Sequence, residues 1–136
     1  MGLIVDASTM LGWHFQDEAH PPSEVLRRLV KEPVMVPRHF AAELANGVVI
    51  AERKRRTEPA HTANLLSLLE LVAAEIDQDG AEQVFERVLP LARAYALSVY
   101  DALYLELAER RGLSLASRDG ALSRAARKAG LKVLAA

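Results

Sequence analysis

Two acidic residues follow apolar runs in positions where parallel strands would present them. Asp6 comes directly after Leu3–Val5, and Asp119 lies shortly after the apolar run 113–116. If both runs are parallel strands, both carboxylates lie at the sheet edge where ligands bind in α/β folds. Each residue also suits a helix N-cap, so a capping role is an open alternative.

Two further acids lie on the apolar faces of predicted helices. Asp101 shares its face with Leu97 and Leu105, and Glu43 shares its face with Ile50. A buried carboxylate normally has a cationic partner, a metal ion or a raised pKa, because burying an unpaired charge is costly. For Asp101 a salt bridge to an arginine is the alternative, and for Glu43 a position at the edge of the face that reaches water.

Metal binding explains all four carboxylates together. Acids that converge in one pocket repel one another unless a cation joins them. The chain has no cysteine and its four histidines have no metal-ligand spacing, so we interpret them as surface or capping residues. Oxygen donors alone suit Mg²⁺ or Mn²⁺. Such an ion activates water and stabilises phosphoryl oxygens, which is nuclease or phosphatase chemistry.

The elements that must position these acids alternate between short apolar runs and helical periodicity. We expect strands at Leu3–Val5, Val34–Val36, 75–77, 113–116 and 132–134. We expect helices at 7–16, from 21 onward, and at 39–57, 59–72, 82–95, 98–111 and 120–129. This alternation predicts the α/β class, as a three-layer α/β/α sandwich around a parallel sheet of four to five short strands. At 136 residues, one domain over 1–136 is expected.

Charge limits how the chain can contact nucleic acid. There are 17 Lys and Arg against 18 Asp and Glu, a net charge of −1, which excludes binding by bulk positive charge. Arg38 and Arg118 lie beside the proposed site and are the candidates for phosphate contact, whereas the basic run 53–56 is interpreted as a solvated helix end. No apolar stretch is long enough to cross a membrane and no signal peptide is evident, so a cytoplasmic protein without membrane contact is expected.

Four segments together resemble the PIN-domain ribonucleases, and within them the VapC-type toxins of bacterial toxin–antitoxin pairs. These segments are IVDAS from Ile4, PRHFAAELAN from Pro37, ALSVYDALYLELA from Ala96, and LASRD from Leu115. The third is the most specific, and the fourth departs from the family in having Ser117 where threonine is commoner. The similarity covers essentially the whole chain.

The resemblance implies an endoribonuclease that cleaves single strands or loops of RNA. It implies that Asp6, Glu43, Asp101 and Asp119 hold one or two Mg²⁺ or Mn²⁺ ions, and that Ser8, Asn46 and Ser117 orient water or the acids. It also implies a homodimer silenced by a VapB-like antitoxin, in a heterotetramer or octamer.

Two alternatives remain open from the sequence. A phosphohydrolase on a related fold would want a second carboxylate two residues after Asp6, where this chain has Ser8. A non-catalytic α/β domain would bind only a partner, with its acids serving as caps and salt bridges. The leucine-rich helix 59–72 has more apolar residues than one core face needs, Leu66 being the surplus residue. Core packing is expected for this helix, with a partner surface as the alternative.

Overall fold

A five-stranded, all-parallel sheet forms the centre of the computed structural model, which describes residues 2–15 and 20–136. The strand order is β3-β2-β1-β4-β5. The strands are β1 (Leu3–Val5), β2 (Val34–Val36), β3 (Glu75–Ile76), β4 (Ser114–Ala116) and β5 (Val133–Leu134). The predicted parallel sheet is thus confirmed.

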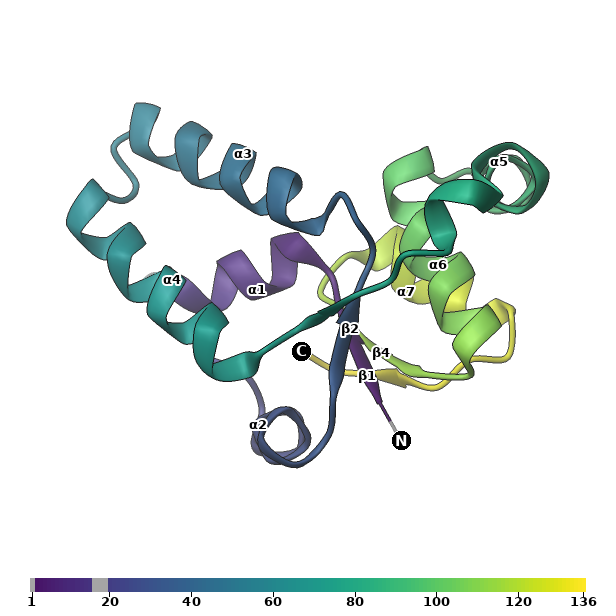
Figure 1. Cartoon of the computed structure of the whole chain (residues 1–136), viewed down its shortest axis with the longest axis horizontal. Helices are drawn as coiled ribbons and strands as arrows, with labels where there is room; N and C mark the ends of the chain where they lie inside the picture. The colour runs from purple at the N-terminus through teal and green to yellow at the C-terminus, as the bar shows by residue number, and fades with distance from the viewer. Residues whose placement is uncertain (1, 16–19) are drawn as a thin grey trace.

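Helices cover both faces of the sheet, which gives the predicted three layers (Figure 1). Helices α1–α4 lie on one side and α5–α7 on the other. Their bounds are α1 (Ala7–His14), α2 (Ser23–Lys31), α3 (Phe40–Arg53), α4 (Pro59–Val72), α5 (Leu89–Tyr95), α6 (Val99–Arg111) and α7 (Gly120–Lys128). The α/β/α sandwich follows because each connection between parallel strands must cross a face of the sheet.

Strand β1 lies at the point where the chain reverses its direction of travel through the sheet. From β1 the chain moves outward to β2 and β3, and then returns to β4 on the other side of β1. Leu3 pairs with Val34 of β2 and with Ser114 of β4. All three residues of β1 are buried, as expected for a central strand covered on both faces. The crevice beyond the carboxyl end of β1 is therefore the expected ligand site.

Helices α1 and α3 pack closely where α3 has a glycine. A Cβ built on Gly47 would lie 2.5 Å from Leu11 Cδ2. A side chain at this position would displace Leu11, so the glycine lets Leu11 pack against α3 without a shift. Close contact with α1 fixes the orientation of α3, the helix that carries Glu43.

The prediction of one regular α-helix over 82–95 is wrong. The segment forms a 3₁₀ turn at Gly80–Gln83, a π-helical turn at Val84–Val88 and only then α5. Pro90 explains the change, because its ring has no N–H and would crowd the carbonyl four residues earlier in a regular helix. The wider π turn accommodates the proline.

One predicted helix end and two predicted core positions also differ from the structure. Helix α3 ends at Arg53 and not at 57, because Arg55 adopts a left-handed backbone with φ 56°. Part of the predicted helix 7–16 lies outside the described residues. Leu68 is 50% exposed and Val30 is 85% exposed, although periodicity places both on core-facing stripes. No helix in the described part of the chain has the length and apolar character to cross a membrane.

Candidate active site

Asp6 follows β1 and occupies the N-cap position of α1, but its side chain does not cap the helix. The residue is only 3% exposed. Its Oδ2 accepts a 2.7 Å hydrogen bond from the hydroxyl of Ser8, whereas Oδ1 is buried without a hydrogen-bond partner in the described part of the chain. The capping explanation fails for this residue because its side chain makes no capping hydrogen bond. A buried carboxylate oxygen without a donor is costly, so the position of Asp6 needs another explanation.

Burial raises the pKa of Asp6 above its ordinary value, and the negative charge of Asp119 raises it further. Hydroxyls of Thr9, Ser8 and Ser117 counter this in part. Thr9 was not singled out from the sequence. Its Oγ1 accepts a 2.8 Å hydrogen bond from the main-chain N–H of Arg118, which ties the end of β4 to α1.

Glu43 lies in the first turn of α3, beyond the end of β2. Its Oε1 accepts a 2.7 Å hydrogen bond from the hydroxyl of Tyr104 and lies 3.6 Å from Nε2 of His39. Burial raises the pKa of Glu43, the Tyr104 hydroxyl opposes the rise, and the charge of Asp6 adds to it. The carboxylate thus lies near Asp6 and does not simply reach into water.

Asp101 lies in the first turn of α6, after Ser98 at the N-cap. The Ser98 hydroxyl accepts the Asp101 N–H at 3.1 Å, so Ser98 caps the helix and the Asp101 carboxylate is not needed for capping. Burial raises the pKa of Asp101 to about 6, together with the negative charges of Asp119, Glu43 and Asp6. The four predicted acids therefore come from four parts of the chain and act on one another electrostatically.

Asp119 does cap a helix. It is the N-cap of α7, and its Oδ1 accepts the N–H of Leu122 at 2.8 Å. Ser117 holds the same turn, since its hydroxyl accepts the Asp119 N–H at 3.0 Å. Asp119 can cap α7 and also repel Asp101 electrostatically, because the cap uses only one oxygen of the carboxylate.

The donor chemistry of this cluster fits a hard divalent cation. It consists of carboxylates, one of which has a buried oxygen without a partner. Among residues 2–15 and 20–136, no three acidic or histidine side chains are gathered closely enough to hold one ion as they stand. Mutual repulsion between the carboxylates is the physical reason to expect this separation when no cation joins them.

The remaining predicted residues differ in their surroundings. Asn46 and Arg38 are exposed. The Arg118 Nε donates to the main-chain oxygen of Ala136 at 3.0 Å, so this guanidinium is already engaged. The prediction that His39 is a surface or capping residue is wrong. Its side chain is 17% exposed, it makes no capping hydrogen bond, and both ring nitrogens are buried without a hydrogen-bond partner among the described residues.

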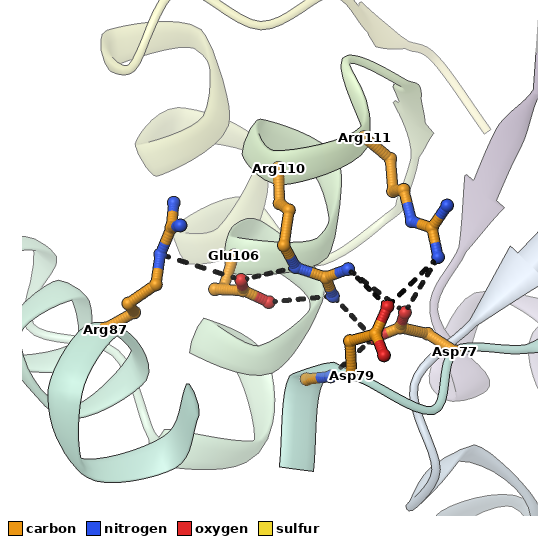
Figure 2. A network of polar contacts seen from close by, with 7 residues as sticks. Asp77, Asp79, Arg87, Glu106, Arg110 and Arg111 are labelled. Carbon is orange, nitrogen blue, oxygen red and sulfur yellow. Dashed lines mark hydrogen bonds and ion pairs between the residues drawn. The ribbon is translucent and has the colours of Figure 1, made fainter. Parts of the chain in front are cut away.

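A second group of buried charges forms a hydrogen-bonded network of its own and was missed from the sequence. Glu106 is fully buried and Asp77 is 1% exposed. Arg110 joins them, with Nε 2.7 Å from Glu106 Oε1 and Nη1 3.1 Å from Asp77 Oδ1 (Figure 2). Arg87, Arg111 and Asp79 surround this network.

Two sequence signals point to this network. Glu106 and Arg110 have the i, i+4 spacing of a helical ion pair. Asp77 directly follows β3 in the structure, as Asp6 follows β1, but the expected strand 75–77 included residue 77, so the rule that selects Asp6 was not applied to it. An acid after a strand is therefore a sign of the right edge of the sheet, and only its partners distinguish an ion pair from a candidate ligand.

Comparison with known proteins agrees with this architecture. The family model described as PIN domain matches residues 3–128. The solved structure described as "Crystal structure of PAE2754 from Pyrobaculum aerophilum" is similar, with a TM-score of 0.67 and 23% sequence identity, covering 98% of this chain and 92% of that one. No curated protein matches the chain. PIN domains are in general metal-dependent nucleases. The match over nearly the full sequence, on a parallel sheet with acids at its carboxyl edge, means that the chain belongs to the PIN domain family.

Proposed function

We propose that this chain is a Mg²⁺- or Mn²⁺-dependent endoribonuclease, and that it is the toxin of a VapBC-type pair. The observation that carries the proposal is the electrostatic convergence on Asp101. Burial is the main cause of the raised pKa of Asp101, and the charges of Asp119, Glu43 and Asp6 raise it further although the four residues are far apart in sequence. Such an arrangement is unfavourable in an empty protein and becomes favourable when a cation neutralises it.

Asp6, Glu43, Asp101 and Asp119 would hold the ion. When bound, Mg²⁺ or Mn²⁺ lowers the pKa of a bound water and neutralises charge on phosphoryl oxygens. The chain's own contribution is orientation. Ser8 holds one oxygen of Asp6, and Ser117 holds the turn that presents Asp119. Asn46 is exposed, one helical turn beyond Glu43, and would contact water or substrate.

RNA is the proposed substrate, bound through few charges. The net charge of −1 leaves phosphate binding to local groups. Arg38 is exposed and precedes α3, whose first turn carries Glu43. It is therefore the better candidate of the two arginines, because Arg118 already donates to the main chain. Single strands and loops are the proposed targets, as the resemblance to PIN-domain ribonucleases implies.

The test is cleavage of RNA by the purified protein in Mn²⁺, in Mg²⁺ and in EDTA. Asp101→Asn removes the proposed central ligand, and Asp79→Asn is a matched control because Asp79 is 64% exposed and belongs to the other charge network. We expect metal-dependent cleavage by the wild type and the control, and none by Asp101→Asn. Cleavage that persists in EDTA or in Asp101→Asn contradicts the proposal. Hydrolysis of a phosphomonoester without RNA cleavage would favour a phosphohydrolase.

A toxin role requires a partner that silences the enzyme. An exposed apolar groove on the surface is the proposed binding site for this partner. Leu26, Val30, Leu68 and Leu71 are 47–85% exposed and line a groove of about 570 Å³ between α1, α2 and α4. An exposed apolar surface of this kind is typical of a protein-binding site. The proposed occupant is an apolar segment of the antitoxin.

Expression in bacteria tests the toxin role apart from the nuclease chemistry. Wild-type protein is expected to arrest growth, and Asp101→Asn is expected not to. Normal growth with an active purified nuclease would retain the enzyme and reject the toxin. The proposed homodimer is checked by light scattering, which gives a mass near twice 14.9 kDa if it forms.

A further inference from the structure

Tyr104 connects the end of β1 to the carboxylate of Glu43. Its side chain is fully buried on α6. The hydroxyl donates to Glu43 Oε1 at 2.7 Å and accepts the main-chain N–H of Ala7 at 3.2 Å. Ala7 follows Asp6, so one phenol contacts both the strand end that carries one acid and the helix that carries another.

We propose that Tyr104 is a positioning residue for metal binding, which fixes Glu43 through Oε1 and leaves Oε2 to serve the cation. The inference rests on the proposed metal-dependent function. Both polar neighbours of the carboxylate, the Tyr104 hydroxyl and Nε2 of His39, lie on Oε1. A hydrogen bond to one oxygen sets the rotamer of the glutamate and restricts which oxygen faces the other acids.

Tyrosine is well suited to this position because it remains a proton donor. Its hydroxyl accepts the main-chain N–H of Ala7, so its own proton is directed to Glu43 Oε1. The ring also packs against His39 in an edge-to-face arrangement, with 5.2 Å between centroids and 68° between planes.

Removing only the hydroxyl tests the proposal. In Tyr104→Phe the ring remains and the donor to Glu43 is lost. We expect Mn²⁺ binding, measured by calorimetry, to weaken by about 10-fold, the lower range for loss of a partner that orients a metal ligand. We expect kcat to fall by a similar factor while KM for RNA is unchanged. Tyr95→Phe is the matched control, since it makes the same change at the end of α5.

A double-variant cycle distinguishes positioning from general support of the fold. If Tyr104 acts through Glu43, Tyr104→Phe has no further effect on Mn²⁺ binding in a Glu43→Ala background, which lacks the oxygen that accepts the Tyr104 hydroxyl. Equal losses in both backgrounds, or Mn²⁺ binding by Tyr104→Phe as tight as in the wild type, overturn the proposal. Failure of the wild type to bind Mn²⁺ overturns the proposed function and this inference with it. If the wild type binds Mn²⁺ and Tyr104→Phe binds it equally well, only the inference is overturned.

A measurement on the wild type keeps the proposal testable if Tyr104→Phe does not fold. We expect the hydroxyl proton between Tyr104 and Glu43 to exchange slowly enough to be followed by NMR, because the Tyr104 side chain is fully buried. We expect this signal to persist when Mg²⁺ is added, because Oε1 is not released to the ion. Loss of the hydroxyl signal on addition of Mg²⁺ would mean that Glu43 gives up the phenol, and the proposal would be wrong.

Discussion

Arg110 binds Asp77 through both arms of its guanidinium, although 33 residues separate them. Nη1 donates to Oδ1 at 3.1 Å and Nη2 to Oδ2 at 2.5 Å. Asp77 follows β3 at one edge of the sheet, and Arg110 lies in the last turn of α6. This bidentate pair therefore fastens the outermost strand on one side to the helix that carries Asp101 at its other end.

Replacing Arg110 by alanine should destabilise the fold strongly. The substitution leaves Asp77 and Glu106 buried without their shared cation, and uncompensated buried charges cost about 3–5 kcal/mol. Urea unfolding measures the loss. Arg111→Ala is the control, because the Arg111 side chain is 42% exposed and its ion pairs are expected to contribute less than about 1 kcal/mol. Similar effects of the two substitutions would contradict the importance of the buried pair.

The same pair predicts a loss of stability in acid. Burial raises the pKa of Asp77, but the hydrogen bonds from Arg110 and Gly80 outweigh burial and hold this pKa below its ordinary value of 3.8. A carboxyl with a lowered pKa stabilises the fold fully above pH 3.8 and loses that contribution as the pH falls through its folded value. Wild type and Asp77→Asn are therefore expected to differ by a constant amount near neutrality and to converge below pH 3.8.

Asp101→Asn is expected to stabilise the protein in EDTA. The substitution removes a charge that burial and the three neighbouring acids disfavour. The expected gain at pH 8 is at most about 1 kcal/mol, because solvent screens this half-buried group. Thermal unfolding in EDTA provides the measurement. A clear drop in melting temperature would indicate an unrecognised cationic partner and would weigh against the metal site.

Arg38→Ala should weaken RNA binding with little effect on the chemical step. We expect KM to rise by roughly 5–10-fold with kcat retained, and the salt dependence of binding to fall by about one counterion. Arg93→Ala on α5 is the matched control, since Arg93 is also exposed. A fall in kcat at constant KM would place Arg38 at the reacting phosphate, contrary to a binding role.

The strands and their order of appearance could be predicted because all except β3 (Glu75–Ile76) are mainly apolar runs next to clear helix boundaries. Leu3–Val5 and Val34–Val36 match the structure residue for residue. The sheet edge that carries Asp6 and Asp119 then followed from the parallel topology. This part of the site depends on local sequence and on general rules of chain crossing, which a single sequence contains.

The rest depends on partners that are distant in sequence. Nothing local distinguishes Asp77, bound by Arg110, from Asp6, whose Oδ1 has no hydrogen-bond partner in the described part of the chain. Tyr104 lies on a face that periodicity assigns to the core, and its hydroxyl contact with Glu43 spans 61 residues. Leu68 satisfies the apolar pattern of α4 but remains exposed, because the pattern does not state how much of a helix its neighbours cover.

The four carboxylates are divided equally between the two halves of the chain. Asp6 and Glu43 precede the exposed turn 54–58 between α3 and α4, and Asp101 and Asp119 follow it. A chain opened at this turn would give two fragments, each with half of the acids, joined in the sheet by pairing of β1 with β4 and of β2 with β3. Neither fragment alone would have a complete site, so the protein offers a natural two-piece complementation system. Mixing the separate fragments, with RNA cleavage as the signal, would report their reassembly.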